Sequence, residues 1–230
     1  MIRPAFEKIA ASKRERLMSA AVEEFATQGF HKANVNRIAA RSGISIGSLY
    51  NYFDTKEDLF SATFQHGKNI LEGVFYAALE AEGPLEYRLK VLFRQACQVA
   101  RKHPAFVQMY MNLASGGTGE LTEKLVTETE RVGSLAYKQL FLDAEKRGEL
   151  DEHFDPGTAT FVIDNNLLAL TASFGSSFYR IRRSEMLGLP KRLGEVAADQ
   201  LADSIVERLL VGLGIQRQPP KLRGLSMETL

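Results

Sequence analysis

The sequence predicts an all-α protein, and three observations support this fold class. Apolar residues recur at helical spacing along most of the 230-residue chain, whereas no stretch shows the apolar and polar alternation of a half-buried strand. Capping residues, glycines and prolines divide the chain into segments of helical length. Residues 34–53 hold two such segments, separated by one tight turn. We therefore expect a small N-terminal unit of three helices around this turn, followed by a larger helical part.

The first segment of this stretch carries helix signals at both ends. Asn34 can cap its start, and Gly43 follows its last turn, where a left-handed residue often closes a helix. Ile38 and Ala39 form its apolar face. The first helix is therefore expected to end at Gly43.

A second helix is expected directly after the turn. Ser45 can cap it, and Ile44, just outside it, has the spacing of a hydrophobic staple with Leu49. Leu49 and Phe53 lie four residues apart and form the buried side. The two helices make a helix-turn-helix. The residues left on or near the outer face are Ile46, Gly47, Ser48, Tyr50 and Asn51.

This motif resembles a known DNA-binding signature. The positions that carry the resemblance are Ile38-Ala39, Ser42-Gly43-Ile44-Ser45, Gly47-Ser48-Leu49-Tyr50, Tyr52-Phe53, Lys56-Glu57 and Leu59. Over roughly its first quarter, the chain resembles the tetracycline-repressor-like (TetR) family of bacterial regulators. Two positions depart from the family pattern: Asn34 stands where a threonine is common, and Ile46 where a basic or polar residue is frequent. Ile46 suggests an apolar contact, for example to a thymine methyl group.

The resemblance implies contacts with double-stranded DNA. Tyr50, Tyr52 and Lys56 would hold phosphates, and the remaining outward residues would lie against base edges, with Asn51 as the best polar reader and Gly47 permitting close approach. The full set of expected DNA-binding residues is Asn34, Val35, Ile46, Gly47, Ser48, Tyr50, Asn51, Tyr52 and Lys56.

Charge is distributed unevenly along the chain. The formal net charge is only +1, yet residues 1–53 hold eight lysines and arginines against four acids, and the remainder is net acidic. Residues 1–11 are therefore interpreted as a basic arm that touches phosphates, because even sequence-independent contacts release counterions. An ordinary solvated surface is the alternative interpretation.

The first long helix is expected to begin at Ser12, where Ser12 and Glu15 have capping-box spacing, and to end at Gly29. It would support the helix-turn-helix. Residues 1–54 are therefore expected to form the N-terminal domain.

A fourth helix is expected to link the two halves of the chain. Thr55 and Asp58 repeat the capping pattern, and Gly83-Pro84 provides the stop. Lys56 lies in the first turn of this helix, where the helix dipole disfavours a cation. A DNA phosphate would compensate, and a solvated lysine is the alternative.

The larger domain is expected to cover residues 55–214, with residues 215–230 as a frayed tail. Its further helices are expected over residues 84–101, from Pro104 to a glycine linker at 116–119, over 121–147, over 156–182, and in a last helix that ends before Gly214.

The last two long helices carry more apolar surface than one partner covers. The helix over 156–182 is apolar almost all round, and the last helix has a four-residue stripe of Leu201, Ile205, Leu209 and Leu213. In the resembled family the last two helices of each subunit form an intersubunit four-helix bundle, which implies a homodimer. A purely intramolecular core is the alternative.

The middle of the chain offers residues that could line a cavity for a small molecule. Methionine and aromatic side chains with a few polar groups suit a pocket, although ordinary core packing is the alternative. The expected lining residues are Phe93, Cys97, Met109, Tyr110, Leu113, Tyr137, Phe141, Asn166 and Phe178. The polar run Asp164-Asn165-Asn166 must face solvent, bind a ligand or set the register of a dimer, because unpaired burial costs about 1–3 kcal/mol.

Several classes of function are disfavoured. The four histidines lack metal-ligand spacing, and no G-x-S-x-G elbow is present, so neither a metal site, a cofactor nor an enzyme is expected. Cys97 is the single cysteine, so a buried thiol is favoured over a redox sensor. No apolar run approaches the roughly 18 residues of a membrane span, so a cytoplasmic protein is expected.

These features favour a ligand-responsive homodimeric regulator. By the resemblance, it would be a repressor released from a pseudo-palindromic operator by a small apolar or amphipathic effector. The alternative is an effector-independent DNA-binding protein that recruits a protein partner through its C-terminal domain.

Overall fold

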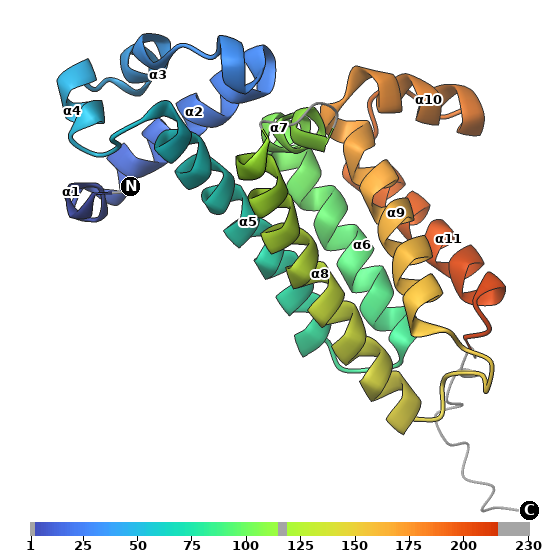
Figure 1. The fold of residues 1–230 in the computed structure, drawn as a ribbon. Helices are drawn as coiled ribbons and strands as arrows, with labels where there is room; N and C mark the ends of the chain where they lie inside the picture. The colour runs from blue at the N-terminus through green and yellow to red at the C-terminus, as the bar shows by residue number, and fades with distance from the viewer. Residues whose placement is uncertain (1–2, 115–118, 216–230) are drawn as a thin grey trace, which may run out of the picture.

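A computed structural model confirms the all-α fold class and describes residues 3–114 and 119–215. Every named element of these residues is a helix, and an isolated antiparallel bridge pairs Leu150 with Ile215. Figure 1 shows the N-terminal helices gathered at one end of a bundle of long helices. Within the described ranges, no helix is both long and apolar enough to span a bilayer.

The N-terminal helices follow the expected order, preceded by a short helix, α1, that was not predicted within the arm. Their bounds are Pro4–Glu7 for α1, Ala11–Lys32 for α2, Val35–Ser42 for α3 and Ile46–Tyr50 for α4. The prediction that Ser12 caps α2 is wrong, because the helix begins one residue earlier and Ala10 occupies the cap position. Gly29 does leave helical geometry, with a φ of 68°, but one more turn follows it to Lys32.

Helix α5, Lys56–Glu80, links the two halves as expected. The capping box is confirmed: the Asp58 amide donates to Thr55 Oγ1 at 3.1 Å, and the Thr55 amide donates to Asp58 Oδ2 at 3.1 Å. The first turns of α5 contribute Leu59 and Phe64 to the N-terminal core, and its later turns contribute Phe75 to the C-terminal core. One continuous helix therefore joins both cores.

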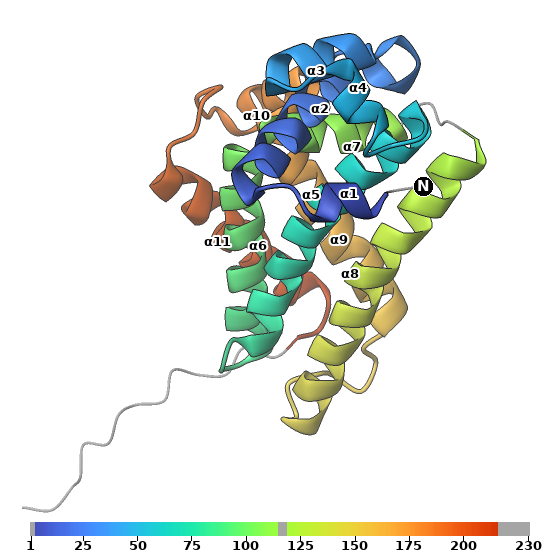
Figure 2. The ribbon, with the colours of Figure 1, turned by 90° about the vertical axis from the view of Figure 1, so that its left-hand side faces the viewer.

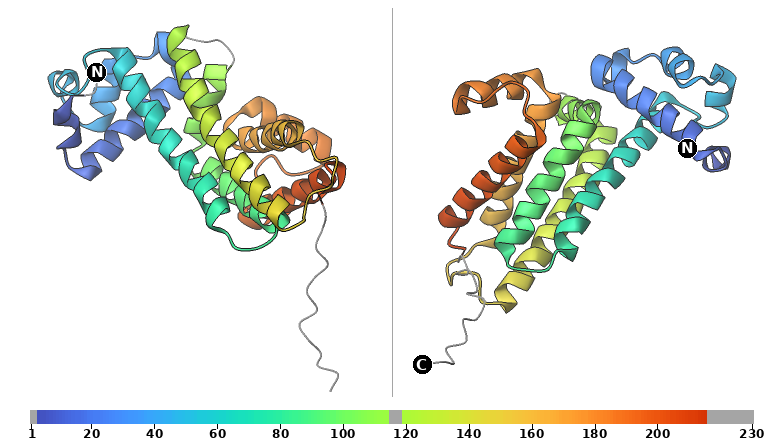
Figure 3. Two further views of the ribbon diagram at one scale, coloured as in Figure 1. Left: turned by 60° about the horizontal axis from the view of Figure 1, so that its bottom comes forward. Right: turned by 180° about the vertical axis from the view of Figure 1, so that it is seen from behind.

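The C-terminal half forms a bundle around α6. The bounds of its helices are Leu85–Lys102 for α6, Pro104–Ala114 for α7, Glu120–Lys146 for α8, Pro156–Gly175 for α9, Ser177–Leu187 for α10 and Glu195–Gly212 for α11. Helix α11 packs along α6, as the view from behind shows (Figure 3). Asp155 caps α9 as expected, accepting from the Gly157 amide at 2.9 Å.

The prediction of a single helix over residues 156–182 is wrong, because the helix is interrupted at Ser176. Ser176 adopts extended geometry between α9 and α10. At the break, Gly175 lies so close to α7 that an added Cβ would be 2.7 Å from the Pro104 carbonyl oxygen and from Val107 Cβ. The interruption of the helix therefore coincides with close packing against α7. The residues around Ser176 alone could not have predicted that packing.

The buried face of α11 also differs from the expected stripe. The fully buried residues are Ala198, Ala202, Val206 and Leu210, and the leucine and isoleucine stripe one position away is only partly buried. Two alanines, a valine and a leucine are thus buried, and the predicted stripe is left at the edge of the bundle.

Helix α7 belongs to both halves. Its Met109 and Leu113 lie in the N-terminal core, and its Asn112 side chain donates to the Ala26 carbonyl of α2 at 2.8 Å. Figure 2 shows α7 below α2, between the helix-turn-helix region and the long helices. The division at residues 54 and 55 stays a prediction, since packing continues across it.

The end of the helical domain is better ordered than expected. Ile215, assigned to the frayed tail, is buried and forms the bridge with Leu150. Residues 216–230 of that tail and residues 116–118 of the expected glycine linker lie outside the described residues.

Candidate nucleic-acid interface and central cavity

The helix-turn-helix is held by the local caps that the sequence predicts. Asn34 Oδ1 accepts from the Asn36 amide at 2.9 Å, and Ser45 Oγ accepts from the Ser48 amide at 3.1 Å. Gly43 closes α3 with a φ of 71°, a conformation that favours glycine. These contacts define both ends of α3 and the start of α4.

A buried glutamate of α2 adds a tertiary restraint that sequence reasoning missed. Glu24 is 1% exposed, accepts from the Asn34 amide at 3.0 Å, and lies 3.3 Å from Arg37 and 3.7 Å from Arg41. It therefore anchors the start of α3 and orients two half-exposed arginines. The signal was a lone acid on the apolar face of α2, beside the exposed Glu23.

Helix α4 turns a continuous surface outward. Ile46 is 38% exposed, Tyr50 is 49% exposed, and Gly47 and Asn51 are also exposed. An added Cβ at Gly47 would meet no atom within 4 Å, so the chain's own packing does not require glycine there. That open space is compatible with close approach of another molecule.

Tyr52 and Lys56 are less free than the expected phosphate contacts. Tyr52 is buried against Phe6, and its hydroxyl accepts from Lys13 Nζ at 3.2 Å. Lys56 Nζ donates to the His31 carbonyl at 3.1 Å and lies 4.8 Å above the Phe30 ring. The carbonyl and the ring thus compensate the cation at the start of α5. Contact of either residue with DNA stays a prediction, as do the roles of the half-buried Val35 and Ser48.

The expected basic arm is folded against the domain. Arg3 Nε donates to Asp54 Oδ1 at 2.6 Å, and the Arg3 amide donates to the Tyr52 carbonyl at 3.0 Å. The hydrogen bond from Arg3 lowers the pKa of the Asp54 carboxyl. At least this cation is therefore engaged within the chain.

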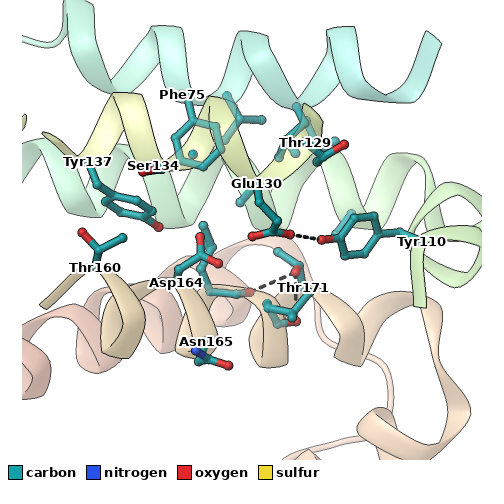
Figure 4. Close-up of a pocket in the computed structure, with 18 of the residues that line it drawn as sticks. Phe75, Tyr110, Thr129, Glu130, Ser134, Tyr137, Thr160, Asp164, Asn165 and Thr171 are labelled. Atoms are coloured by element: carbon teal, nitrogen blue, oxygen red, sulfur yellow. Dashed lines mark hydrogen bonds between the residues drawn. The ribbon is translucent and has the colours of Figure 1, made fainter. Parts of the chain in front are cut away.

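A cavity of about 520 Å³ lies between α5, α6, α7, α8 and α9 (Figure 4). Its size is that of a site for a small molecule. Apolar side chains from α5 and α6 form one wall. The polar residues among its lining are Tyr110, Thr129, Glu130, Ser134, Tyr137, Thr160, Asp164, Asn165 and Thr171.

Only Tyr110 and Tyr137 of the expected lining residues line this cavity. The others lie elsewhere: Phe93, Cys97 and Phe141 in the C-terminal core, Met109 and Leu113 in the N-terminal core, Asn166 bonded to the Val162 carbonyl, and Phe178 64% exposed on α10. The apolar members were misassigned because a helical pattern identifies a buried face without showing whether a helix or a cavity lies opposite. Burial raises the pKa of Cys97 to about 12, in keeping with a packed thiol.

The three polar residues at positions 164–166 of α9 lie in different environments. Asp164 and Asn165 line the cavity, whereas the Asn166 amide donates to Val162 of its own helix at 2.8 Å. Burial, followed by the charge of Glu130, raises the pKa of Asp164 to about 6. Tyr110 donates a hydrogen bond to Glu130 across the gap between α7 and α8. Glu130 was missed in the sequence, whereas Asp164 was left open between solvent, a ligand and the register of a dimer.

Fold and site together define a helical DNA-binding regulator with a separate internal cavity. Residues 17–63 match the family model for bacterial regulatory proteins of the tetR family. The chain belongs to this family of transcriptional regulators, and the relatives it matches are regulators rather than enzymes.

Similarity is strongest in the N-terminal part. The transcriptional activator FasR of Mycolicibacterium smegmatis is 40% identical over 63 residues, which cover 27% of this chain and 29% of FasR. The repressor KstR2 of the same species is 29% identical over 147 residues, 64% of this chain and 69% of KstR2. The structure of FadR from Bacillus subtilis in complex with stearoyl-CoA superposes with a TM-score of 0.68 at 18% identity, covering 86% of this chain and 98% of that one. The last comparison supports the fold alone.

Proposed function

We propose that the chain is a homodimeric cytoplasmic repressor that leaves its operator when a small effector enters the central cavity. The observation that carries this proposal is the position of α7, which lines the cavity and also packs on α2. The bound stearoyl-CoA of the FadR structure supports a small-molecule effector in this fold.

The DNA-binding half of the proposal rests on α4. In a symmetric dimer, two copies of its outward face would enter successive major grooves, because half-sites of such motifs lie about one helical turn apart. Ile46, Gly47 and Asn51 would approach base edges, and the half-exposed Arg37 and Arg41 of α3 would add positive charge to the helix-turn-helix.

The dimer half rests on apolar surface left uncovered in the single chain. Val196 and Val211 of α11 are each 71% exposed, and the stripe that includes Leu201 and Leu209 is only partly covered. Ile181 of α10 is also exposed. A second copy that covers α9 and α11 would bury this surface, since exposed apolar patches favour association.

The switch half rests on contacts that join the cavity to the DNA-binding helices. Phe106 and Tyr110 of α7 line the cavity, while Asn112 binds the backbone of α2. Phe106 also lies so close to α5 that an added Cβ at Gly67 would be 1.7 Å from the ring, so any larger residue would have to displace Phe106. A ligand that displaces Phe106 or Tyr110 would therefore move α7 against α2 and α5, and it would release DNA to the extent that it prefers the displaced state.

The test is selection of bound sequences from a random duplex pool by the purified protein at near-physiological salt. Enrichment of an inverted repeat with half-sites about one turn apart supports the dimeric regulator. A folded dimer that enriches nothing, or a monomer that enriches single half-sites, contradicts it. Unchanged DNA binding with the cavity filled would instead favour the effector-independent, partner-recruiting protein.

A further inference from the structure

The charged groups in the cavity are all acidic. Glu130 projects from α8 at the exposed rim, and Asp164 projects from α9 on the facing wall (Figure 4). No lysine, arginine or histidine occurs among the described residues that line the cavity. The carboxylate of a fatty acid or the phosphates of a nucleotide would therefore meet negative charge there without a compensating cation.

A buried hydroxyl faces the acids across the same space. The Tyr137 side chain is fully buried, and its hydroxyl interacts with the Asp164 carboxyl group. In Figure 4 this hydroxyl points from α8 toward Asp164. A tyrosine hydroxyl that faces a carboxylate keeps lone pairs that can accept from a donor on a ligand.

Aromatic side chains line the same cavity. Phe75, Phe106, Tyr110, Tyr137 and Phe161 all contribute to the lining. Faces of aromatic rings attract cations, and the attraction grows where water is excluded. The same rings would cover the apolar part of a ligand.

We propose that the effector of this cavity is an organic ammonium compound with an apolar body. Its N–H donors would bind the carboxylates of Glu130 and Asp164 and the hydroxyl oxygen of Tyr137, which together provide an acceptor for each of the three donors of a primary ammonium. The inference rests on the proposed function, because it names the ligand class of the same cavity. It assigns this chain a ligand of opposite charge to an acyl-CoA.

The test compares three probes that share a pyrene ring on a short alkyl chain and carry a cationic, neutral or anionic end group: 1-pyrenebutylamine, 1-pyrenebutanol and 1-pyrenebutyrate. Fluorescence titration of the purified protein near neutral pH gives the three affinities. The amine is expected to bind at least tenfold more tightly than the alcohol, and the carboxylate least tightly.

Variants locate the preference. Glu130→Gln and Asp164→Asn should each reduce the ratio of amine to alcohol affinity several-fold, with little effect on the alcohol itself. Glu145→Gln, the same substitution at an exposed site of α8 outside the cavity, should leave the ratio unchanged.

The outcomes separate the two proposals. Equal binding of amine and alcohol overturns the ammonium inference and leaves the effector cavity standing, as does tighter binding of the carboxylate. The same ratio in wild type and both acid variants also overturns it. Failure of all three probes to bind contradicts both the ammonium inference and the effector half of the proposed function.

Discussion

The helix-turn-helix and the central cavity are assembled in different ways. The first is shaped mainly by residues close together in the chain, such as Asn34, Gly43 and Ser45, each of which satisfies backbone groups within a few residues. The second brings together Phe75, Glu130 and Asp164 from helices far apart in the sequence. Local geometry therefore fixes one surface, and tertiary packing fixes the other.

One residue is an exception to this contrast, and its substitution should have the largest effect. Glu24→Ala removes the buried acceptor of the Asn34 amide and the partner of Arg37 and Arg41, so the free energy of unfolding should fall by about 2–3 kcal/mol. Urea denaturation measures it. Glu23→Ala, at the exposed neighbour, should change stability by less than about 0.5 kcal/mol. Equal losses in the two variants would show that Glu24 does not anchor α3.

Asp164 should make the stability of the protein depend on pH through the cavity. Its pKa of about 6 lies above the usual value, so its contribution to stability is fully present below about pH 4 and is lost as the pH rises through about 6. The groups that face it are Glu130, Tyr137 and Tyr110, and none of them is a cation. Asp164→Asn should therefore stabilise the protein by about 2 kcal/mol near pH 8 and by little near pH 4.

Asp155→Asn provides a control of opposite sign. Hydrogen bonds from Thr158 and the Gly157 amide lower the pKa of Asp155, so it stabilises the protein at neutral pH and loses that effect as the pH falls through its lowered value. Urea denaturation across the pH range measures both variants. A pH-independent gain for Asp164→Asn would contradict the buried, ionised carboxylate.

Substitution of Gly47 tests the DNA-binding role of α4 separately from its folding. Gly47→Ala meets open space in the chain and has better helix propensity, so stability should stay the same or rise by up to about 1 kcal/mol. Operator affinity should fall at least tenfold if DNA occupies that space. Gly73→Ala, an equally uncrowded helical site on α5, should leave affinity unchanged. Normal affinity of Gly47→Ala would remove the close-approach role.

Lys56 should show the smallest effect. If it contacts a phosphate, Lys56→Ala should weaken binding to all DNA sequences alike and reduce the salt dependence by about one ion. Filter binding over a salt series measures the slope. An unchanged slope would restrict Lys56 to its observed contacts with His31 and Phe30.

The same contrast explains how far the sequence could predict the molecule. The caps at Asn34, Ser45 and Thr55 were predictable because each acts within three residues of itself. The outward face of α4 followed from helical periodicity once Leu49 and Phe53 were assigned to the core.

The cavity was not predictable in the same way. Asp164 was flagged as a polar residue on an apolar helix, but nothing in the sequence distinguished Glu130 from the other acids of α8. Which apolar residues face a cavity rather than a neighbouring helix depends on how α8 and α9 pack with α5, α6 and α7. The break at Ser176 likewise depends on α7, because Gly175 must fit against Pro104 and Val107.

The coupling between the two regions is the central claim, and one measurement tests it directly. The affinity of the protein for its selected inverted repeat is measured with and without saturating 1-pyrenebutylamine, in the wild type and in a variant that combines Glu130→Gln with Asp164→Asn. We predict at least a tenfold loss of affinity in the wild type and little change in the variant. Unchanged affinity in the wild type, with the probe shown by fluorescence to be bound, would contradict the claim that α7 transmits occupancy of the cavity to the DNA-binding helices.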